Sequence, residues 1–286
     1  MVDDFPGTNV RHFKRHDARH DLPGYYALAD LPTRPSIEKI AIDTGWWELD
    51  RIWKLYPGQF TVITGIAGHG KSTFVLNVLC NLAKKHGTRS FLFVPENEQH
   101  LRDKMRKIHG GTDGEFSELA KNYIFVQSAV LGNYNDDPVT LAWVLSQAAQ
   151  VIEDDNLDVL LIDPWNELEH AKRKDQSTTE YIGESLMMLK NFARSHSVAI
   201  ILVAHPTKAT FHDGKPRVPN LADIEGSMNW YNKADNGLVV WRDFGNNSAE
   251  VISSKVREVG AGKIGKCVFH VDENTSVFTP QYGAAT

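Results

Sequence analysis

From residue 60 onward, short apolar runs alternate with longer amphipathic segments. The apolar runs cover residues 60–64, 90–94, 123–127, 158–163, 198–204 and 237–241. The amphipathic segments, whose apolar side chains recur three and four positions apart as on one helix face, lie between them at residues 72–86, 98–109, 139–155 and 178–196. The apolar runs are continuous rather than alternating, which predicts strands of a sheet covered on both faces. We therefore predict an α/β fold with a doubly wound, mostly parallel sheet.

The chain changes character on either side of this alternating region. After residue 241 the apolar runs "EVISSKV", "KCVFHV" and "SVFTP" follow one another without a helical segment between them, which predicts antiparallel hairpins that finish the sheet. Residues 1–40 are polar and contain several prolines, as is typical of an exposed arm. We therefore predict an N-terminal arm and linker over residues 1–40 and one domain over residues 41–286.

Three histidines in the arm offer a different interpretation. His12, His16 and His20 are four residues apart, so on a helix their imidazoles would share one face and bind a metal ion. No cysteine or carboxylate pattern supports such a site, and we expect a solvated tail.

Composition places the chain among ordinary globular proteins. Hydrophobic residues make up 42% of the 286 positions, and the formal net charge is −5. This charge excludes a protein that coats nucleic acid with its whole surface, although a local basic track remains compatible with it. The sequence has no run of about 18 apolar residues and no apolar signal core, so we predict a cytoplasmic protein with no membrane partner. Cys80 and Cys267 have apolar neighbours and are expected to be buried free thiols.

The stretch "GIAGHGKS" at residues 65–72 satisfies the pattern G-x-x-x-x-G-K-[ST] directly after a predicted strand and before a predicted helix, the context of a phosphate-binding P-loop. Glycines let backbone N–H groups turn inward around phosphates, and the helix start adds partial positive charge. Lys71 is expected to contact the β and γ phosphates and Ser72 to bind Mg²⁺, while His69 receives no side-chain role. The candidate nucleotide-binding residues are Gly65, Ala67, Gly68, His69, Gly70, Lys71, Ser72 and Thr73.

Two carboxylates that follow other strands complete a candidate hydrolytic site. Asp163 ends a buried apolar run, where a carboxylate is costly unless it faces a cation or donor, so we predict that it positions Mg²⁺ in the Walker B role. The alternative is an aspartate that caps the strand before Pro164. Glu96 follows the run 90–94 at the edge of the sheet where ligands bind, so it can polarise a water molecule. A solvated loop acid is the rival interpretation for Glu96.

Several further segments carry a family resemblance. The segment at residues 42–65 contains T-G-x-x-x-L-D followed by P-G, "VAHPTK" lies at residues 203–208, an I-x-G-S…A-D-N pattern spans residues 223–240, and K-x-R…G-x-x-G spans residues 253–265. In this order, the segments resemble the RecA-type core of the hexameric replicative helicases, which include DnaB, Twinkle and the helicase halves of phage primase-helicases. The resemblance covers about residues 41–270 and implies a RecA-like fold. Within this family, the His-Pro form of the fourth-strand motif resembles the Twinkle and phage branch.

The resemblance implies roles for four residues. Glu96 matches the position of the catalytic glutamate, and His205 that of the polar residue that senses the γ phosphate. Lys255 and Arg257 match a lysine and an arginine that the adjacent subunit contributes, the arginine as a finger on the γ phosphate. Without the resemblance, Lys255 and Arg257 would be interpreted as solvated charges.

Contacts to DNA are expected from the loop at residues 206–220, since in the family the loop after the sensor histidine lines the ring channel. The candidate residues in this loop are Lys208, Lys215 and Arg217, whose charges can contact phosphates. Gly226 and Ser227, which follow the loop, are also candidates, since they offer backbone N–H groups and a hydroxyl. A second basic segment, residues 170–180, is a weaker candidate. Residues 20–40 are interpreted either as the linker that docks on the next subunit through Tyr25, Tyr26 and Leu28 or as a disordered leader.

Together these features predict an NTP-dependent DNA helicase. The resemblance implies a homo-oligomeric ring of six that binds Mg²⁺ and ATP or dTTP, travels 5′ to 3′ on single-stranded DNA, unwinds duplex and has primase and polymerase as possible partners. One alternative is a recombinase-like DNA-dependent ATPase that binds or loads DNA without unwinding it. Another is a nucleotide-binding interaction protein with vestigial turnover.

Overall fold

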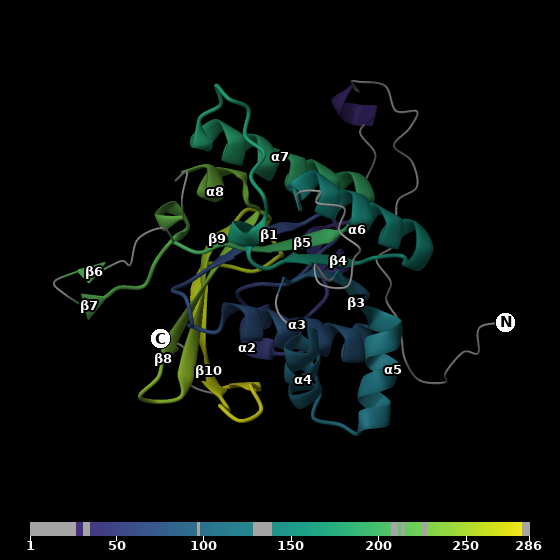
Figure 1. Cartoon of the computed structure of the whole chain (residues 1–286), viewed down its shortest axis with the longest axis vertical. Helices are drawn as coiled ribbons and strands as arrows, with labels where there is room; N and C mark the ends of the chain where they lie inside the picture. Colours follow the sequence, from purple (N-terminus) through teal and green to yellow (C-terminus); the bar gives the residue numbers. More distant parts are fainter. Residues whose placement is uncertain are drawn as a thin grey trace.

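The computed structural model describes most of the chain beyond its N-terminal arm (Figure 1). The described residues are 27–30, 35–95, 98–127, 139–206, 211–212, 215–224 and 228–281. His12, His16, His20, Tyr25, Tyr26, Glu96, Lys208, Gly226 and Ser227 lie outside these ranges. Leu28, the remaining predicted anchor of the linker, is 87% exposed.

Among the described residues, one sheet of nine strands forms the centre of the protein, in the order β11-β10-β9-β8-β1-β5-β4-β2-β3. Its strands are β1 (Phe60–Thr64), β2 (Ser90–Phe93), β3 (Ile124–Gln127), β4 (Val159–Ile162), β5 (Ala199–Val203), β8 (Asn236–Asp243), β9 (Ser248–Val256), β10 (Gly265–Val271) and β11 (Phe278–Pro280). The six strands from β8 to β3 in this order pair in parallel, and β9, β10 and β11 continue the sheet with antiparallel pairings. The prediction of a doubly wound, mostly parallel sheet finished by antiparallel hairpins is confirmed.

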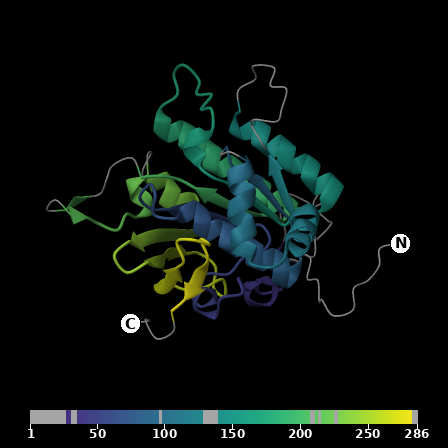
Figure 2. The same ribbon diagram turned by 60° about the horizontal axis from the view of Figure 1, so that its bottom comes forward.

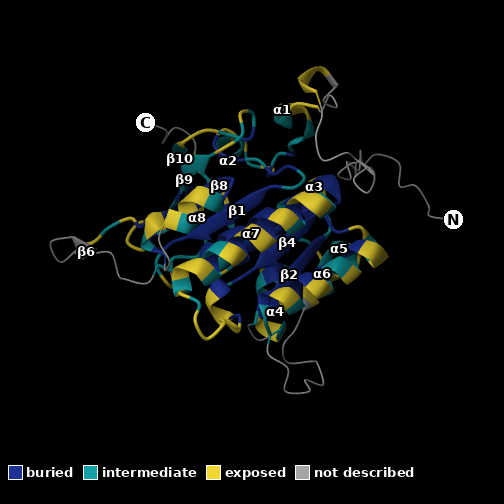
Figure 3. Ribbon diagram, turned by 90° about the horizontal axis from the view of Figure 1, so that it is seen from above, coloured by how far each residue is buried: buried dark blue, intermediate teal, exposed yellow. Residues whose placement is uncertain are grey.

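Helices cover both faces of the sheet (Figure 1). One face carries α2 (Trp47–Asp50), α3 (Lys71–His86), α4 (Glu98–His109) and α5 (Asp113–Tyr123), which Figure 2 brings forward. The other carries α6 (Leu141–Asp155), α7 (Thr178–His196) and α8 (Met228–Lys233). Seen from above, the outer sides of α6 and α7 are exposed while the strands beneath them are buried (Figure 3). The remaining elements are η1 (Leu28–Asp30), α1 (Ile37–Ile40), η2 (Trp165–Glu167), β6 (Phe211–His212), β7 (Lys215–Pro216) and η3 (Leu221–Asp223).

Burial on both faces explains the continuous apolar runs of the sequence. Along β1, Phe60 and Val62 belong to the core under α6 and α7, whereas Ile63 belongs to the core under α3 and α4. All five residues of β1 are buried, so neither side of the strand has a place for a charged residue.

The predicted helices and strands agree closely with the observed ones where the local sequence pattern is strong. β1, α4 and α7 occupy the predicted residues, and α3 begins one residue earlier than predicted. α5, which follows a capping box formed by Thr112 and Glu115, is not among the helices predicted from the apolar spacing. Both cysteines are free and buried, as predicted, and burial raises the pKa of the Cys267 thiol to about 12. No helix in the described ranges is long and apolar enough to cross a membrane.

Asn77 joins the helix that follows the P-loop to the last strand of the sheet. Its Oδ1 accepts the N–H of Phe278 at 3.0 Å, and its Nδ2 donates to the carbonyl of Ser276 at 2.9 Å and to that of Thr73 at 2.8 Å. Asn77 is buried, so water cannot replace these bonds without a structural change. One side chain therefore fixes β11 against α3.

We expect Asn77→Ala to lower the free energy of unfolding by about 2–4 kcal/mol, because it leaves a buried N–H and a carbonyl without their partner. Chemical denaturation measures this change. Asn246→Ala is the matched control, since Asn246 bonds Asp243 on an exposed turn, and should change stability by less than about 0.5 kcal/mol. Equal effects of the two substitutions would contradict a clamping role for Asn77.

Candidate active site

The P-loop connects β1 to α3 through a backbone that only glycine adopts easily. Gly65, Gly68 and Gly70 have φ angles of 152°, 79° and 84°. Gly65 also packs against the neighbouring strand, because a Cβ at this position would stand 2.3 Å from the carbonyl oxygen of Val240. The glycines of the motif therefore serve both the turn and the close approach of the loop to β8.

Lys71 is the first residue of α3 and lies buried beneath this loop. Its Nζ donates to the carbonyls of Gly65 at 2.8 Å and Ile66 at 3.0 Å. Burial lowers the pKa of Lys71 to about 8, and the nearby carboxylate of Asp163 partly opposes that shift. A partly desolvated ammonium group beside backbone N–H groups at a helix start is suited to bind a polyphosphate.

The carboxyl ends of three neighbouring strands bring the candidate catalytic groups together. The P-loop follows β1, His205 follows β5, and Asp163 follows β4, with β5 between the other two strands. Asp163 is 3% exposed. Burial, together with the charge of Lys71, lowers the pKa of His205 below its ordinary value of 6.5, so its imidazole is neutral at neutral pH. The backbone N–H of His205 faces Oδ1 of Asn166 at 3.4 Å.

The side chains at this edge fit a magnesium ion. Ser72 offers a hydroxyl at the start of α3, and Asp163 offers a carboxylate that is buried yet close enough to Lys71 to affect its pKa. Hard oxygen donors of this kind are the ligands that Mg²⁺ prefers. Glu96, the predicted catalytic carboxylate, lies outside the described residues, although β2, which precedes it, ends at the same edge.

His69 has a structural role that was not predicted from the sequence. Its Nδ1 accepts the backbone N–H of Arg242 at 3.1 Å, and its ring packs against Trp241 and Phe244 with centroid distances of 4.9 and 5.5 Å. The imidazole therefore fixes the P-loop to β8 and to the turn that follows it. These partners are more than 170 residues away in sequence, so no local pattern indicates them.

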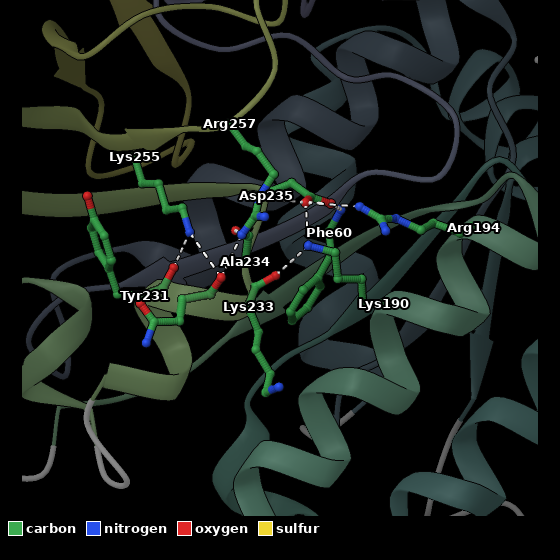
Figure 4. Close-up of polar contacts among 10 residues, drawn as sticks. Phe60, Lys190, Arg194, Tyr231, Lys233, Ala234, Asp235, Lys255 and Arg257 are labelled. Atoms are coloured by element: carbon green, nitrogen blue, oxygen red, sulfur yellow. Dashed lines mark hydrogen bonds and ion pairs between the residues drawn. The ribbon is translucent and has the colours of Figure 1, made fainter. Parts of the chain in front are cut away.

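Lys255 and Arg257 lie together at the end of α8 (Figure 4). Lys255 Nζ donates to the carbonyl of Tyr231 and lies over the Tyr231 ring at 4.8 Å. The Arg257 guanidinium donates to the carbonyls of Asn232 at 2.5 Å and Ala234 at 3.3 Å. Burial, with the neighbouring charges of Arg257 and Lys190, lowers the pKa of Lys255 to about 8.

These two cations stand at the opposite edge of the sheet from the P-loop. The backbone N–H of Arg257 bonds the carbonyl of Asp235, and the N–H of Asp235 bonds the carbonyl of Phe60, so Arg257 is level with the start of β1. The P-loop begins at Gly65 beyond the other end of β1, roughly 16 Å away at 3.3 Å per residue. Arg257 therefore cannot reach a phosphate in its own P-loop.

The two ends of the segment that contains the predicted DNA-binding loop lie side by side. Pro206 and Ile224 form an isolated antiparallel bridge, and the hairpin of β6 and β7 projects away from the sheet beyond it (Figure 1). Arg217 forms a two-pronged ion pair with Asp223, at 3.0 and 2.7 Å. Its guanidinium therefore stabilises the base of the loop. To bind a phosphate, Arg217 would have to give up one or both of its contacts with Asp223. Lys215 lies in β7, at the projecting end.

The weaker candidate segment, residues 170–180, is also tied to its surroundings. Lys172 Nζ donates to Thr178 Oγ1 at 3.0 Å, and Arg173 pairs with Glu184 at 2.9 Å. Both contacts are exposed, so they contribute little to stability and leave these charges accessible.

Comparison with protein families gives one match across most of the chain. Residues 41–279 match the family model described as "DnaB-like helicase C terminal domain". The "Twinkle homolog protein, chloroplastic/mitochondrial" of Arabidopsis thaliana is 32% identical over 289 residues, which covers 93% of this chain and 39% of the plant protein. The chain thus spans about two fifths of the length of that relative.

Solved structures share the fold. An ATPase domain superposes with a TM-score of 0.67 and 20% identity, covering 84% of this chain and 90% of that domain. A structure described as that of a DnaB-like replicative helicase and its interactions with primase gives a TM-score of 0.66 and 20% identity, covering 83% of this chain and 62% of the other. These similarities confirm the prediction of a RecA-like fold.

We expect Gly65→Ala to weaken nucleotide binding by roughly tenfold or more, because a Cβ 2.3 Å from the Val240 oxygen displaces the loop at a strain of about 1–3 kcal/mol. Titration with a fluorescent nucleotide measures the affinity. Gly114→Ala is the control, since a Cβ there meets nothing within 4 Å, and it should leave the affinity unchanged. Unaltered binding by Gly65→Ala would show that the loop tolerates the displacement.

Proposed function

The chain belongs to the family of DnaB-like helicase C-terminal domains, and we propose that it is the motor of a ring-forming replicative DNA helicase. It hydrolyses ATP or dTTP and converts that energy into 5′-to-3′ movement along single-stranded DNA and into strand separation. The observation that supports this proposal best is the separation of the P-loop from Lys255 and Arg257 by the length of β1. An ATPase built in this way needs a neighbouring subunit to complete its site.

In the proposed site, the P-loop backbone and Lys71 bind the phosphates, and Ser72 and Asp163 hold Mg²⁺. When bound, the ion neutralises charge on the β and γ phosphates. Lys71 orients the same oxygens, and the neutral imidazole of His205 is available to hydrogen-bond the γ phosphate. Glu96 is proposed to orient the attacking water, since it follows β2, whose carboxyl end lies at this edge of the sheet.

The second half of the site is proposed to come from the adjacent subunit. In a head-to-tail ring every interface is the same, so the Arg257 edge of one subunit faces the P-loop edge of the next. Arg257 then stabilises the charge that develops on the γ phosphate, and Lys255 assists it. Hydrolysis that depends on a neighbour converts chemistry into movement between subunits.

Contacts to the DNA backbone are proposed for Lys208, Lys215, Gly226 and Ser227, with Arg217 holding the loop that carries the lysines. A projecting hairpin with a braced base, such as that of β6 and β7, is suited to follow a strand through a channel (Figure 1). Contacts of this type bind phosphates regardless of sequence.

The partners of the whole protein are also proposals, because the chain spans 39% of its plant relative. A ring of six is the proposed assembly, with residues 41–286 as the ATPase domain and residues 1–40 as the arm and linker. Primase is a proposed partner because one matched structure describes a DnaB-like helicase with primase, and polymerase is a second. The cytoplasmic location stays a prediction, since the plant relative is named for two organelles.

Mixing two inactive variants tests the shared site. Lys71→Ala and Arg257→Ala should each lose nearly all hydrolysis, the second by about 10³- to 10⁵-fold as for other arginine fingers. Rings assembled from equal amounts should recover activity, since about one quarter of the interfaces then combine an intact P-loop with an intact Arg257. Steady-state hydrolysis across mixing ratios measures this recovery, and co-assembled rings that stay inactive would rule out a site shared between subunits.

Forked DNA duplexes test the function as a whole. A fork whose loading tail ends 5′ should be unwound in the presence of ATP or dTTP and Mg²⁺, and a fork with only a 3′ tail should not. Lys71→Ala is the control, because it removes phosphate binding without touching the proposed DNA loop. Hydrolysis stimulated by single strands without strand separation on either fork would instead favour a recombinase-like ATPase.

A further inference from the structure

A buried carboxylate outside the nucleotide site connects three parts of the protein (Figure 4). Asp235 is 1% exposed and precedes β8. Its Oδ2 accepts the N–H of Phe60, at the start of β1, at 3.2 Å. Its Oδ1 lies 2.6 Å from Lys190 Nζ, 3.3 Å from Arg257 Nε and 3.6 Å from a guanidinium nitrogen of Arg194. Three cations thus surround one carboxylate.

The three cations differ in depth. The Lys190 side chain is 8% exposed, whereas the side chains of Arg257 and Arg194 are 39% and 51% exposed. Lys190 also donates to the carbonyl of Lys233 at 2.9 Å, which fixes its ammonium group in place. Burial lowers the pKa of Lys190, and the contact with Asp235 opposes that shift. Lys190 is therefore the permanent partner of Asp235, because it cannot reach water without disturbing the packing of α7.

Arg257 is held at the surface of the same cluster by contacts that are more exposed than those of Lys190. Its Nε stands at 3.3 Å from Asp235, and its remaining bonds go to the carbonyls of Asn232 and Ala234 at the end of α8. These acceptors are backbone groups at a helix C-terminus, which attract cations. Water can replace a guanidinium at carbonyls near the surface, so Arg257 can leave them. The buried Asp235 is different, since its charge needs a cation at all times.

We propose that Lys190 and Asp235 are positioning residues for Arg257. Lys190 neutralises the buried carboxylate, so that Arg257 exchanges between its own Asp235 and the nucleotide of the neighbouring subunit without leaving a buried charge unpaired. Asp235 holds the guanidinium of Arg257 in position whenever Arg257 does not contact the nucleotide of the neighbouring subunit. This inference rests on the proposed action of Arg257 on the neighbouring subunit, and it adds a reason why that arginine is both held and free to move.

The test removes the permanent cation in the full-length protein. In Lys190→Met, Arg257 becomes the nearest cation to a buried carboxylate and should be retained by it. The kcat for DNA-stimulated ATP hydrolysis is expected to fall by about tenfold or more, a part of the 10³ to 10⁵ that an arginine finger contributes. KM should stay within about twofold, because the P-loop is untouched.

The double variant Lys190→Met/Asp235→Asn separates positioning from simple loss of structure. With the carboxylate gone, Arg257 is released, and kcat should return to within about threefold of the wild type. A merely structural role predicts that the double variant is at least as impaired as the single one. If Lys190→Met does not assemble, Lys190→Gln replaces it, since glutamine keeps a donor for Asp235 but carries no charge.

Lys84→Met is the matched control, because Lys84 also donates to a backbone carbonyl, that of His109 at 2.6 Å, but does not touch this cluster. Unchanged kcat in the Lys190 variant, or no recovery in the double variant, would overturn the inference. Arg257→Ala, measured under the same conditions, separates a failure of the shared site from a failure of the positioning role. A normal kcat for Arg257→Ala would reject the shared site itself, whereas a low kcat with no effect at Lys190 would reject only the positioning role.

Discussion

The parallel hydrogen-bond ladder that joins β1 to β5 and β8 fixes where the functional groups of this protein stand. Strands that run in the same direction end at the same edge, so the P-loop, His205 and Asp163 gather at the carboxyl edge of the sheet. The antiparallel return of β9 has the opposite effect, because it brings Lys255 and Arg257 back to the amino edge. One strand length thus separates the proposed phosphate site from the cations proposed to complete a second site.

The two edges of the sheet also differ in the sign of the charge that they bury and in how it is paired. At the carboxyl edge, Lys71 is a buried cation whose pKa is lowered to about 8 and whose Nζ bonds only backbone carbonyls among the described residues. A buried ammonium group of this kind is stabilised most strongly by a bound anion. At the amino edge, Asp235 is a buried anion that is already surrounded by Lys190, Arg194 and Arg257. The first edge is suited to bind an anionic ligand, while the second holds more cations than its one buried carboxylate needs, as the proposed role of Arg257 on a neighbouring subunit requires.

The sequence predicted what depends on local pattern. The P-loop is encoded within eight residues, β1 by a continuous apolar run and α7 by the spacing of its apolar positions, so all three were predicted correctly as local structure. Contacts across the chain were not predictable in this way. His69 meets Arg242 across 173 residues, and Asp235 meets Phe60 across 175, so neither role leaves a mark in the neighbouring sequence. The family resemblance indicated Lys255 and Arg257 and included Asp235 in the A-D-N pattern, but it did not indicate that this carboxylate contacts the arginine.

One short helix connects the two edges. Trp230 in the middle of α8 is fully buried and meets Trp165 edge-on at a centroid distance of 5.6 Å, and Trp165 is two residues after Asp163. The same helix ends at the carbonyls that hold Lys255 and Arg257. α8 therefore contacts both the segment after Asp163 and the cations of the far edge, so packed side chains rather than a loop join the proposed phosphate site to the cations proposed for a second site.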